Sequence, residues 1–529
     1  SVQTDKGILT KPYDNSEPIV LNVDDGKVDG APIQITMTPD TKQGGLRFNW
    51  LTDPRVTKSV IQYKKAGASQ WQTKSGSYYV EAVTAGYKEK AAHRVEIDGL
   101  EPSAQYVYRV GDGGEFMSEE HSFTAPKSAG DKSFKVIFYS DPQSESVENY
   151  MSFKHSIDEA LKVCPNPDLM ISAGDTTQNG YKSTEWEACF EVMGDYYAKY
   201  PTVTVAGNHE MKGDWNFISF AQRFNMSGAN TGYPQFDRTM GYFEYGDAIF
   251  VVLNGEVTPA DQKAEIMKKE LQWCKSVLDA SDKKWRIVMT HAGPYTSNHD
   301  PLDVRDYYIN DTEYSLDAMN VDLFLNGHDH IYIRSTAKND IKVNTGDGTT
   351  YITGGTVGNK FYEYIPARSD YSTDFYVDAE DQQVFSILEF SADSIKGTAY
   401  QKQDPDNWSS FKAVDSYEIR NTLKEGKKVT DYTDVAEGAW YYDAAKFVTD
   451  NQLLGGEKPY EFGPNEALTR AEVASALYNL AGQPDVELAD FSDVPVTHQA
   501  RTAVAWANQN GVMVGVGGGK FNPDAAGSR

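Results

Sequence analysis

The chain is predicted to fold as several domains in series: an all-β domain, a layered α/β domain and a small helical repeat. Three observations predict this. Apolar residues alternate with period two near the start, short apolar strands alternate with helical stretches in the middle, and one block of sequence recurs near the end. The 529 residues also exceed what one hydrophobic core usually organises.

The first folded region is expected over residues 33–126, after an N-terminal arm at 1–32. Its strands are predicted at 34–38, 45–50, 59–63, 93–97 and 106–110. Turn residues separate these segments, and alternation puts every second side chain of a strand on one face. Strands at this spacing are typical of a β-sandwich.

The pattern changes in residues 133–402. Short apolar strands are predicted at 134–139, 169–173, 203–206, 249–253, 287–290 and 321–325, with a closing pair at 384–390 and 394–400. Helical stretches lie between them; in 261–281, the apolar residues Met267, Leu271, Cys274 and Leu278 recur at helical spacing. Alternating strands and helices predict a layered α/β domain.

Residues 403–428 are polar and are predicted to form a linker. The region 429–529 then contains an internal repeat. Residues 432–435 recur as 491–494, 462–465 recur as 521–524, and 469–470 recur as 528–529, each time 59 positions later. The second copy ends at Arg529, before its next helix, so we expect the natural protein to continue.

Composition excludes several classes of function. The formal net charge of −27 makes nucleic acid a poor partner, because nucleic-acid affinity comes mainly from Lys and Arg. No apolar stretch is long enough to predict a membrane span. A small anionic substrate would need local positive charge, which bound metal ions can supply. Three cysteines are compatible either with one disulfide or with three buried thiols.

Five short polar segments follow predicted strands, and they contain the candidate metal-binding and catalytic residues. They are 140–143, 174–175, 207–210, 290–291 and 327–330, and they contain Asp141, Gln143, Asp175, Asn208, His209, Glu210, His291, His328 and His330. Ligand-binding groups in α/β sheets lie just beyond the carboxyl ends of the strands. His328 and His330 are two residues apart, so both can face one site. Carboxylates and imidazoles gathered in this way predict a site for two metal ions.

The segments Gly207-Asn208-His209-Glu210 and Gly327-His328-Asp329-His330 resemble those of the calcineurin-like metallophosphoesterases. The extension of the second segment to Arg334 resembles the purple acid phosphatase branch. Residues 93–112 resemble the N-terminal sandwich of plant-type purple acid phosphatases, a fibronectin type III-like domain. The resemblance implies a four-layer α/β sandwich over 133–402.

The same resemblance implies how the ligands are shared. One metal ion would be held by Asp141, Asp175 and His330, and the other by Asp175, Asn208, His291 and His328. Asp175 would bridge the two. The metals are left open among Fe, Mn and Zn.

Two positions depart from the family pattern. Purple acid phosphatases have a tyrosine ligand where this chain has Gln178, so we expect no purple charge-transfer colour. Many other members have a ligand histidine where this chain has Gln143. Either the Gln143 amide oxygen or a water molecule would fill that position.

The predicted mechanism is attack on phosphorus by a hydroxide that bridges the two metals. His209 is the first candidate for the proton donor to the leaving group, and His299 is the second. Glu210 is predicted to orient His209. Arg334 is expected to form a structural salt bridge near the site.

The repeat, including Trp440 and the segment Leu468-Thr469-Arg470-Ala471-Glu472, resembles an S-layer homology module. Such modules hold bacterial proteins on secondary cell-wall polymers, which implies an exported, wall-associated protein of a Gram-positive-type bacterium. Arg470 either grips an acidic sugar substituent or bridges groups inside the repeat.

We therefore predict a wall-associated phosphomonoesterase that acts on a small phosphorylated substrate. A phosphodiesterase or nucleotidase on the same site is the alternative enzyme. A wall-bound glycan-binding protein with a degenerate catalytic domain is the alternative of another class, and Gln143 and Gln178 motivate it.

Overall fold

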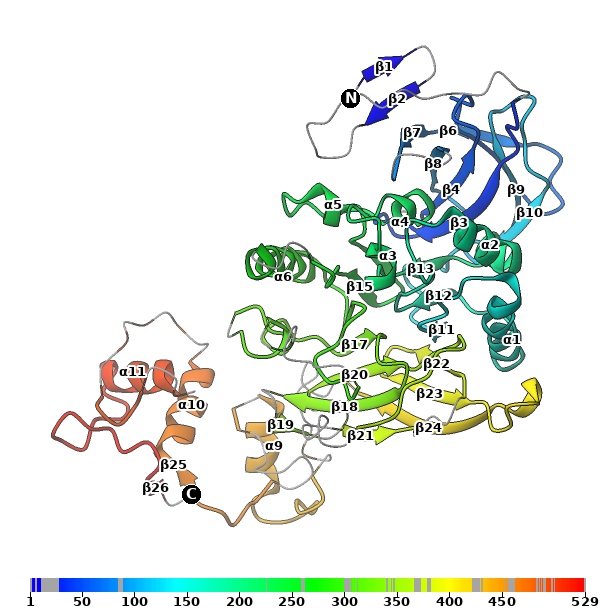
Figure 1. Ribbon diagram of the computed structural model, residues 1–529. Helices are drawn as coiled ribbons and strands as arrows, with labels where there is room; N and C mark the ends of the chain where they lie inside the picture. Colours follow the sequence, from blue (N-terminus) through cyan, green and yellow to red (C-terminus); the bar gives the residue numbers. More distant parts are fainter. Residues whose placement is uncertain are drawn as a thin grey trace. The chain divides into compact units, whose positions relative to one another are not determined.

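The computed structural model forms two compact units, Ser1–Arg420 and Asn421–Arg529 (Figure 1). It describes residues 2–4, 7–10, 28–83, 89–224, 226–257, 262–298, 305, 307–311, 313–338, 341–343, 345, 348–365, 373–377, 382–420, 429, 432–451, 453–454, 462–481, 484, 486, 488, 491–495, 498 and 500–527.

The first domain is a sandwich of two β-sheets, as the period-two pattern predicts (Figure 1). One sheet has the order β1 (Val2–Thr4), β2 (Gly7–Thr10), β7 (Ser77–Glu81), β8 (Ala91–Ile97), β4 (Leu46–Thr52) and β3 (Ile33–Pro39). The other has the order β10 (His121–Thr124), β9 (Gln105–Gly111), β5 (Val60–Lys65) and β6 (Gln72–Ser75). Phe48, Tyr108 and Phe123 pack edge to face between them.

Two further sheets form the centre of the α/β domain (Figure 1). The first has the order β13 (Thr202–Thr204), β12 (Leu169–Ser172), β11 (Phe134–Tyr139), β22 (Val384–Phe390), β23 (Ile395–Gln401) and β24 (Lys412–Ile419). The second has the order β14 (Gly241–Tyr245), β15 (Ala248–Val252), β16 (Trp285–Met289), β17 (Leu323–Asn326), β20 (Thr349–Gly354), β18 (Tyr332–Lys338) and β19 (Ile341–Lys342), with β21 (Thr373–Tyr376) paired to β18. Strands β11 to β13 are parallel, and so are β15 to β17 and β20.

Helices pack against these sheets and against strands β3, β4 and β8 of the sandwich. They are α1 (Val147–Val163), α2 (Ser183–Tyr197), α3 (Asn208–Met211), α4 (Ile218–Arg223), α5 (Pro234–Asp237), α6 (Lys263–Ala280) and the 3-10 turn η3 (Trp408–Ser410). One apolar cluster fills the space between the sheets, and another joins the sheets to α1, α2 and α6. The predicted stripe of Met267, Leu271, Cys274 and Leu278 is buried on α6, and the predicted four-layer order is confirmed.

The prediction of a linker over 403–428 is wrong for residues 412–419, which form β24. Tyr417 and Ile419 of β24 pack in the core between the sheets. The strand was not predicted because a charged residue, Asp415, occupies an inward-facing position where the strand pattern calls for an apolar one. Its carboxylate accepts hydrogen bonds from Tyr332 and Arg334 on β18, and these contacts compensate for its burial.

In the second unit the repeat of 59 residues is also a structural repeat. Helix α9 (Tyr442–Asp450) corresponds to α11 (Arg501–Gln509), which begins 59 positions later. Asp434 accepts hydrogen bonds from the main-chain N–H groups of residues 462 and 463, and Asp493 does so from residues 521 and 522. Helix α10 (Arg470–Leu480) follows β25 (Leu468–Thr469), which pairs with β26 (Ala526–Gly527).

None of the helices in the described ranges has the length and apolar character that a bilayer crossing requires. The three cysteines, Cys164, Cys189 and Cys274, are buried free thiols, and burial raises the pKa of each.

Candidate metal centre

The five polar segments meet where the two central sheets present the carboxyl ends of their parallel strands. Asp141 follows β11, Asp175 follows β12, and Asn208 follows β13 in one sheet. His291 follows β16 and His328 follows β17 in the other sheet. Each of the five segments begins within three residues of the end of its strand, as predicted, and residues far apart in sequence come together.

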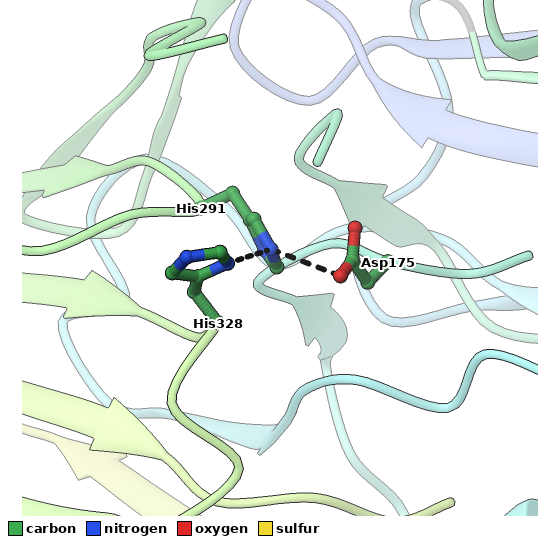
Figure 2. Close-up of side chains that lie close together, drawn as sticks. All are labelled: Asp175, His291 and His328. Atoms are coloured by element: carbon green, nitrogen blue, oxygen red, sulfur yellow. Dashed lines mark hydrogen bonds and ion pairs between the residues drawn. The ribbon is translucent and has the colours of Figure 1, made fainter. Parts of the chain in front are cut away.

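Asp175 belongs to both groups of side chains that are close enough to hold a cation. In one group its Oδ2 atom lies 3.1 Å from His291 Nε2, which lies 3.2 Å from His328 Nδ1 (Figure 2). In the other group, His330 Nε2 lies 3.3 Å from Asp141 Oδ1. The ligand atoms within each group lie within 4.8 Å of one another.

Asn208 adds an oxygen to the first of these groups. Its Oδ1 atom lies 3.2 Å from His291 Nε2 and 3.1 Å from His328 Nδ1. Asn208 is the first residue of the short helix α3, directly after Gly207. The predicted carboxylate, amide and imidazole groups are therefore side by side.

Main-chain carbonyl groups fix the orientation of two of the imidazoles. His291 Nδ1 lies 2.7 Å from the Ala173 oxygen, and His330 Nδ1 lies 2.5 Å from the Lys360 oxygen. A carbonyl only accepts, so the hydrogen of each neutral ring is on Nδ1 and the lone pair is on Nε2. These lone pairs face carboxylate oxygens, an arrangement that is repulsive unless a proton or a cation lies between them.

The electrostatics of the cluster agree with this. Burial raises the pKa of Asp141 to about 7, with the Asp175 charge adding to the effect and His291 opposing it. Burial also opposes ionisation of Asp175 and His291, but their mutual attraction lowers the pKa of Asp175 and raises that of His291 well above its usual value. The cluster thus attracts positive charge. Its oxygen and imidazole donors fit transition-metal ions.

The backbone approaches the cluster closely and is strained there. Asp141, Asp175, His328 and His330 all have positive φ, between 53° and 72°. Left-handed backbone at residues other than glycine costs on the order of 1–3 kcal/mol each and is concentrated at functional sites. At Gly327 a Cβ atom would lie 2.0 Å from Ser140 Oγ, so only glycine fits beside the carboxylate of Asp141.

Gln143 lies beside the second group. Its Nε2 atom lies 3.3 Å from Asp175 Oδ2 and 3.2 Å from His330 Nε2. Its amide oxygen is buried and has no hydrogen-bond partner in the described part of the chain. An unpaired buried acceptor indicates an absent donor or cation.

Glu210 does not orient His209, and that prediction is wrong. Its carboxylate accepts hydrogen bonds from the main-chain N–H groups of Asp175, Thr176, Thr177 and Gly207, at 2.7–3.0 Å. Of these partners, only Gly207 is close to Glu210 in the sequence. The other three belong to the loop after β12. Glu210 therefore holds the loop that presents Asp175.

His209 is held instead by the oxygen of Gln178, 2.7 Å from its Nδ1 atom. Its Nε2 atom lies 3.9 Å from Asp175 Oδ2, and burial lowers its pKa. Its main-chain N–H donates to Asp175 Oδ1 at 2.9 Å. His209 thus borders the cluster, whereas His299, the other predicted proton donor, lies outside the described residues.

Arg334 forms ion pairs with Asp415 and Asp374 at 2.7 and 3.2 Å, as expected of a structural residue. Asp329 points away from the cluster and accepts hydrogen bonds from the main-chain N–H groups of Ser297 and Asn298. The sequence did not reveal the carbonyls of Ala173 and Lys360 that orient the imidazoles. Any residue type supplies a carbonyl, so no sequence signal identifies them.

The two residues predicted to bind cell-wall polymer differ sharply. Trp440 is 90% exposed. Arg470 donates to the carbonyl oxygens of Phe521 and Val514 at 3.0 and 2.7 Å, and its guanidinium lies 4.6 Å from the centre of the Phe521 ring. Arg470 therefore joins the first copy of the repeat to the second.

Comparison with known families covers all three regions. Residues 134–332 match the calcineurin-like phosphoesterase family, residues 32–125 match the purple acid phosphatase N-terminal domain, and residues 431–474 and 490–529 match the S-layer homology domain. These matches confirm the resemblances drawn from the sequence.

Individual relatives agree with the families. Purple acid phosphatase 18 from Arabidopsis thaliana is 26% identical over 333 residues, which cover 60% of this chain and 69% of the relative. A surface-layer 125 kDa protein from Lysinibacillus sphaericus is 36% identical over 131 residues, covering 22% of this chain and 11% of the relative. A purple acid phosphatase from yellow lupin seeds shares the fold, with a TM-score of 0.57 and 14% identity over 74% of each chain.

Proposed function

We propose that this chain is a metal-dependent phosphatase that hydrolyses phosphate monoesters at a centre of two metal ions. The matches to the calcineurin-like phosphoesterase family and to the purple acid phosphatase N-terminal domain support this. The observation that supports this most strongly is the position of Asp175, which is shared between the two groups of candidate ligands. One carboxylate common to two sites is what a pair of neighbouring cations requires.

We assign Asp141, Asp175 and His330 to one ion, and Asp175, Asn208, His291 and His328 to the other. The amide oxygen of Gln143 would join the first ion once the amide turns over, because Nε2 is the atom that faces Asp175 and His330 in this structure. When bound, two such ions lower the pKa of a water molecule and stabilise charge on phosphoryl oxygens. Iron, manganese and zinc all accept these ligands.

The residues around the ligands have separate roles in this proposal. Glu210 holds the loop of Asp175 through its four main-chain partners. Gln178 holds His209 Nδ1, so His209 Nε2 is the atom that would carry a proton to the leaving oxygen. The buried position of His209 at the edge of the cluster supports that assignment.

We further propose that the protein is exported and attached to an acidic secondary cell-wall polymer of a Gram-positive-type bacterium. The two S-layer homology matches and the similarity to a surface-layer protein support this. The exposed Trp440 offers an apolar face to a sugar ring.

Metal analysis combined with kinetics tests the catalytic proposal. After separate reconstitution with Mn, Fe and Zn, we expect about two ions per chain and hydrolysis of p-nitrophenyl phosphate. Slower hydrolysis of bis-p-nitrophenyl phosphate would distinguish a monoesterase from a diesterase. A chain that binds no metal and hydrolyses neither compound would instead favour a wall-bound binding protein.

A further inference from the structure

We propose that the β-sandwich binds an acidic wall polysaccharide on the outer face of its sheet β10-β9-β5-β6, next to Trp71. We call this surface the Trp71 face; it consists of the outward side chains of β5, β9 and β10 together with Trp71, which directly precedes β6. The inference rests on the proposed wall attachment for the presence of such a polymer. It involves neither the candidate metal centre nor the S-layer homology repeats.

The strands of this sheet alternate between a core side and an outer side. The side chains on the core side are Ile61, Tyr63, Tyr106, Tyr108, Val110 and Phe123. Residues between them point the other way, because successive side chains of a strand lie on opposite faces. Lys64, Arg109 and Ser122 are therefore on the outer side, where a ligand can reach them.

Two cations of the Trp71 face contact the same aromatic ring. Lys64 Nζ lies 4.6 Å from the centre of the Trp71 ring, and Arg109 Cζ lies 4.9 Å from it. Arg109 Nε also donates to Gln62 Oε1 at 2.7 Å, which fixes the guanidinium group. An aromatic ring attracts a cation but does not neutralise it, so Trp71 holds two neighbouring positive charges in place.

Neither of these cations has a carboxylate partner in the described part of the chain. The residue next to Lys64 differs, since Lys65 Nζ lies 2.6 Å from Glu101 Oε1. The whole chain has 77 acidic residues and 50 basic ones, so carboxylates are abundant. Two neighbouring cations without a carboxylate repel each other, and an anion bound to both would remove that repulsion.

A cavity of about 480 Å³ lies at the end of the Trp71 face. Ser122 lines it, and in the strand register Val107 lies between Ser122 and Lys64. Two strand spacings, roughly 10 Å, therefore separate Lys64 from the cavity. Lys199 of the α/β domain also lines the cavity; its Nζ atom lies 5.1 Å from the centre of the Tyr200 ring, and no carboxylate partner of it is found among the described residues.

These groups fit an acidic sugar polymer better than nucleic acid or a second copy of the chain. Nucleic-acid affinity grows with the number of phosphates neutralised, and the chain has a net charge of −27. In a two-fold contact between copies, the cations of one face would meet those of the other. A sugar polymer offers acid groups to the cations, and its hydroxyl groups can bond to Gln105, Ser122 and Thr124 in the cavity.

Calorimetry on the full chain tests the proposal. The probes are oligogalacturonate, in which every sugar carries a carboxylate, and a maltooligosaccharide of equal length, which carries none. We expect only the acidic probe to bind. Lys64→Gln and Arg109→Gln should each weaken its binding about three-fold and the double variant about ten-fold, as expected for ion pairs at a partly exposed surface. Lys65→Gln is the matched control, because Glu101 already neutralises that cation, and its binding should be unchanged.

Hydrogen exchange then locates the bound probe on the same full chain. We expect slower exchange in residues 60–75 and 105–124, whereas binding at the repeats alone would slow exchange only within 429–529. Lys199→Gln should weaken a long oligogalacturonate about two-fold and leave a short one unaffected, since only the long chain reaches from Trp71 into the cavity.

Several results would overturn the proposal: no binding of the acidic probe, equal binding of the neutral probe, or equal losses in Lys65→Gln and the double variant. Slower exchange confined to the repeats would do so as well, and so would tighter binding of single-stranded DNA or self-association that the double variant abolishes. Hydrolysis of p-nitrophenyl phosphate and binding to isolated cell walls are recorded separately. Failure of the proposed function is therefore distinguishable from failure of the Trp71 face.

Discussion

His93 in the β-sandwich and His291 in the α/β domain are both fully buried, yet their surroundings differ. His93 Nε2 lies 2.7 Å from Thr52 Oγ1, its Nδ1 lies 2.8 Å from Ser59 Oγ, and its ring stacks on Trp50. His291 Nε2 faces Asp175 Oδ2, Asn208 Oδ1 and His328 Nδ1.

The difference shows that the partners, and not burial, separate a structural histidine from a candidate ligand. A hydroxyl group can donate or accept, so one of Thr52 and Ser59 accepts from a neutral His93 while the other turns its hydrogen from a main-chain oxygen to the ring lone pair. Burial alone then lowers the pKa of His93 to about 4. The oxygens around His291 only accept, and their charge raises its pKa well above the usual value despite burial.

The largest expected effect comes from substituting the two histidines in parallel. His291→Ala should lower kcat for p-nitrophenyl phosphate by roughly 10³-fold or more, since one electrostatic contact in a transition state is already worth 10²–10³. Its metal content should fall as well. His93→Gln should retain both kcat and metal content. Equal losses of kcat and metal in the two variants would show that burial alone explains the effect.

The pH dependence of stability should also distinguish them. The pKa of His93 is lowered from 6.5 to about 4 on folding, so between these pH values the unfolded chain binds the proton and the folded chain does not. Stability should therefore fall as the pH falls from 6.5 to 4, by about 3 kcal/mol at the limit. Urea unfolding at several pH values measures this.

In His93→Gln the pH dependence should be weaker than in the wild type by the same amount. The difference between the two curves isolates His93, because the other titrating groups are common to both proteins. Superimposable curves would contradict the assignment.

A smaller effect is expected for Glu210→Gln, which leaves every candidate ligand in place. The amide keeps only one of the two acceptor oxygens, so two of the four main-chain hydrogen bonds around the Asp175 loop are lost, and such supporting contacts are typically worth about 10–100-fold in metal affinity or activity. Glu185→Gln is a control, since Glu185 is equally buried but holds Asn179. Metal titration and kcat are the measurements.

The smallest effect is expected in the repeats. Arg470→Lys keeps the charge but loses the planar guanidinium that donates to the Phe521 and Val514 carbonyl oxygens together. This loss should destabilise the repeat unit by about 1 kcal/mol. A thermal scan detects this. If Arg470 instead grips the wall polymer, binding to isolated cell walls would fall while the melting temperature stays unchanged.

The sequence predicted the folds and most of the candidate site, because the spacing of apolar residues indicates the strands and the polar segments that follow the strands indicate the site. Strand β11 was placed at its observed bounds by its run of apolar residues, and the repeat of 59 residues is visible without any structure. The sequence failed at β24, where Asp415 faces inward and the segment is polar. It also failed for Glu210, whose main-chain partners come mostly from another loop.

By itself the sequence determined which side chains follow the strands, and so which carboxylates, amides and imidazoles are available. Only the tertiary structure decided how they are used. The Ala173 and Lys360 carbonyls set the imidazole orientations, and the Asp175 loop depends on Glu210. The physical reason is that side-chain identity is local, whereas hydrogen-bond partners and electric fields depend on distances between segments far apart in the chain.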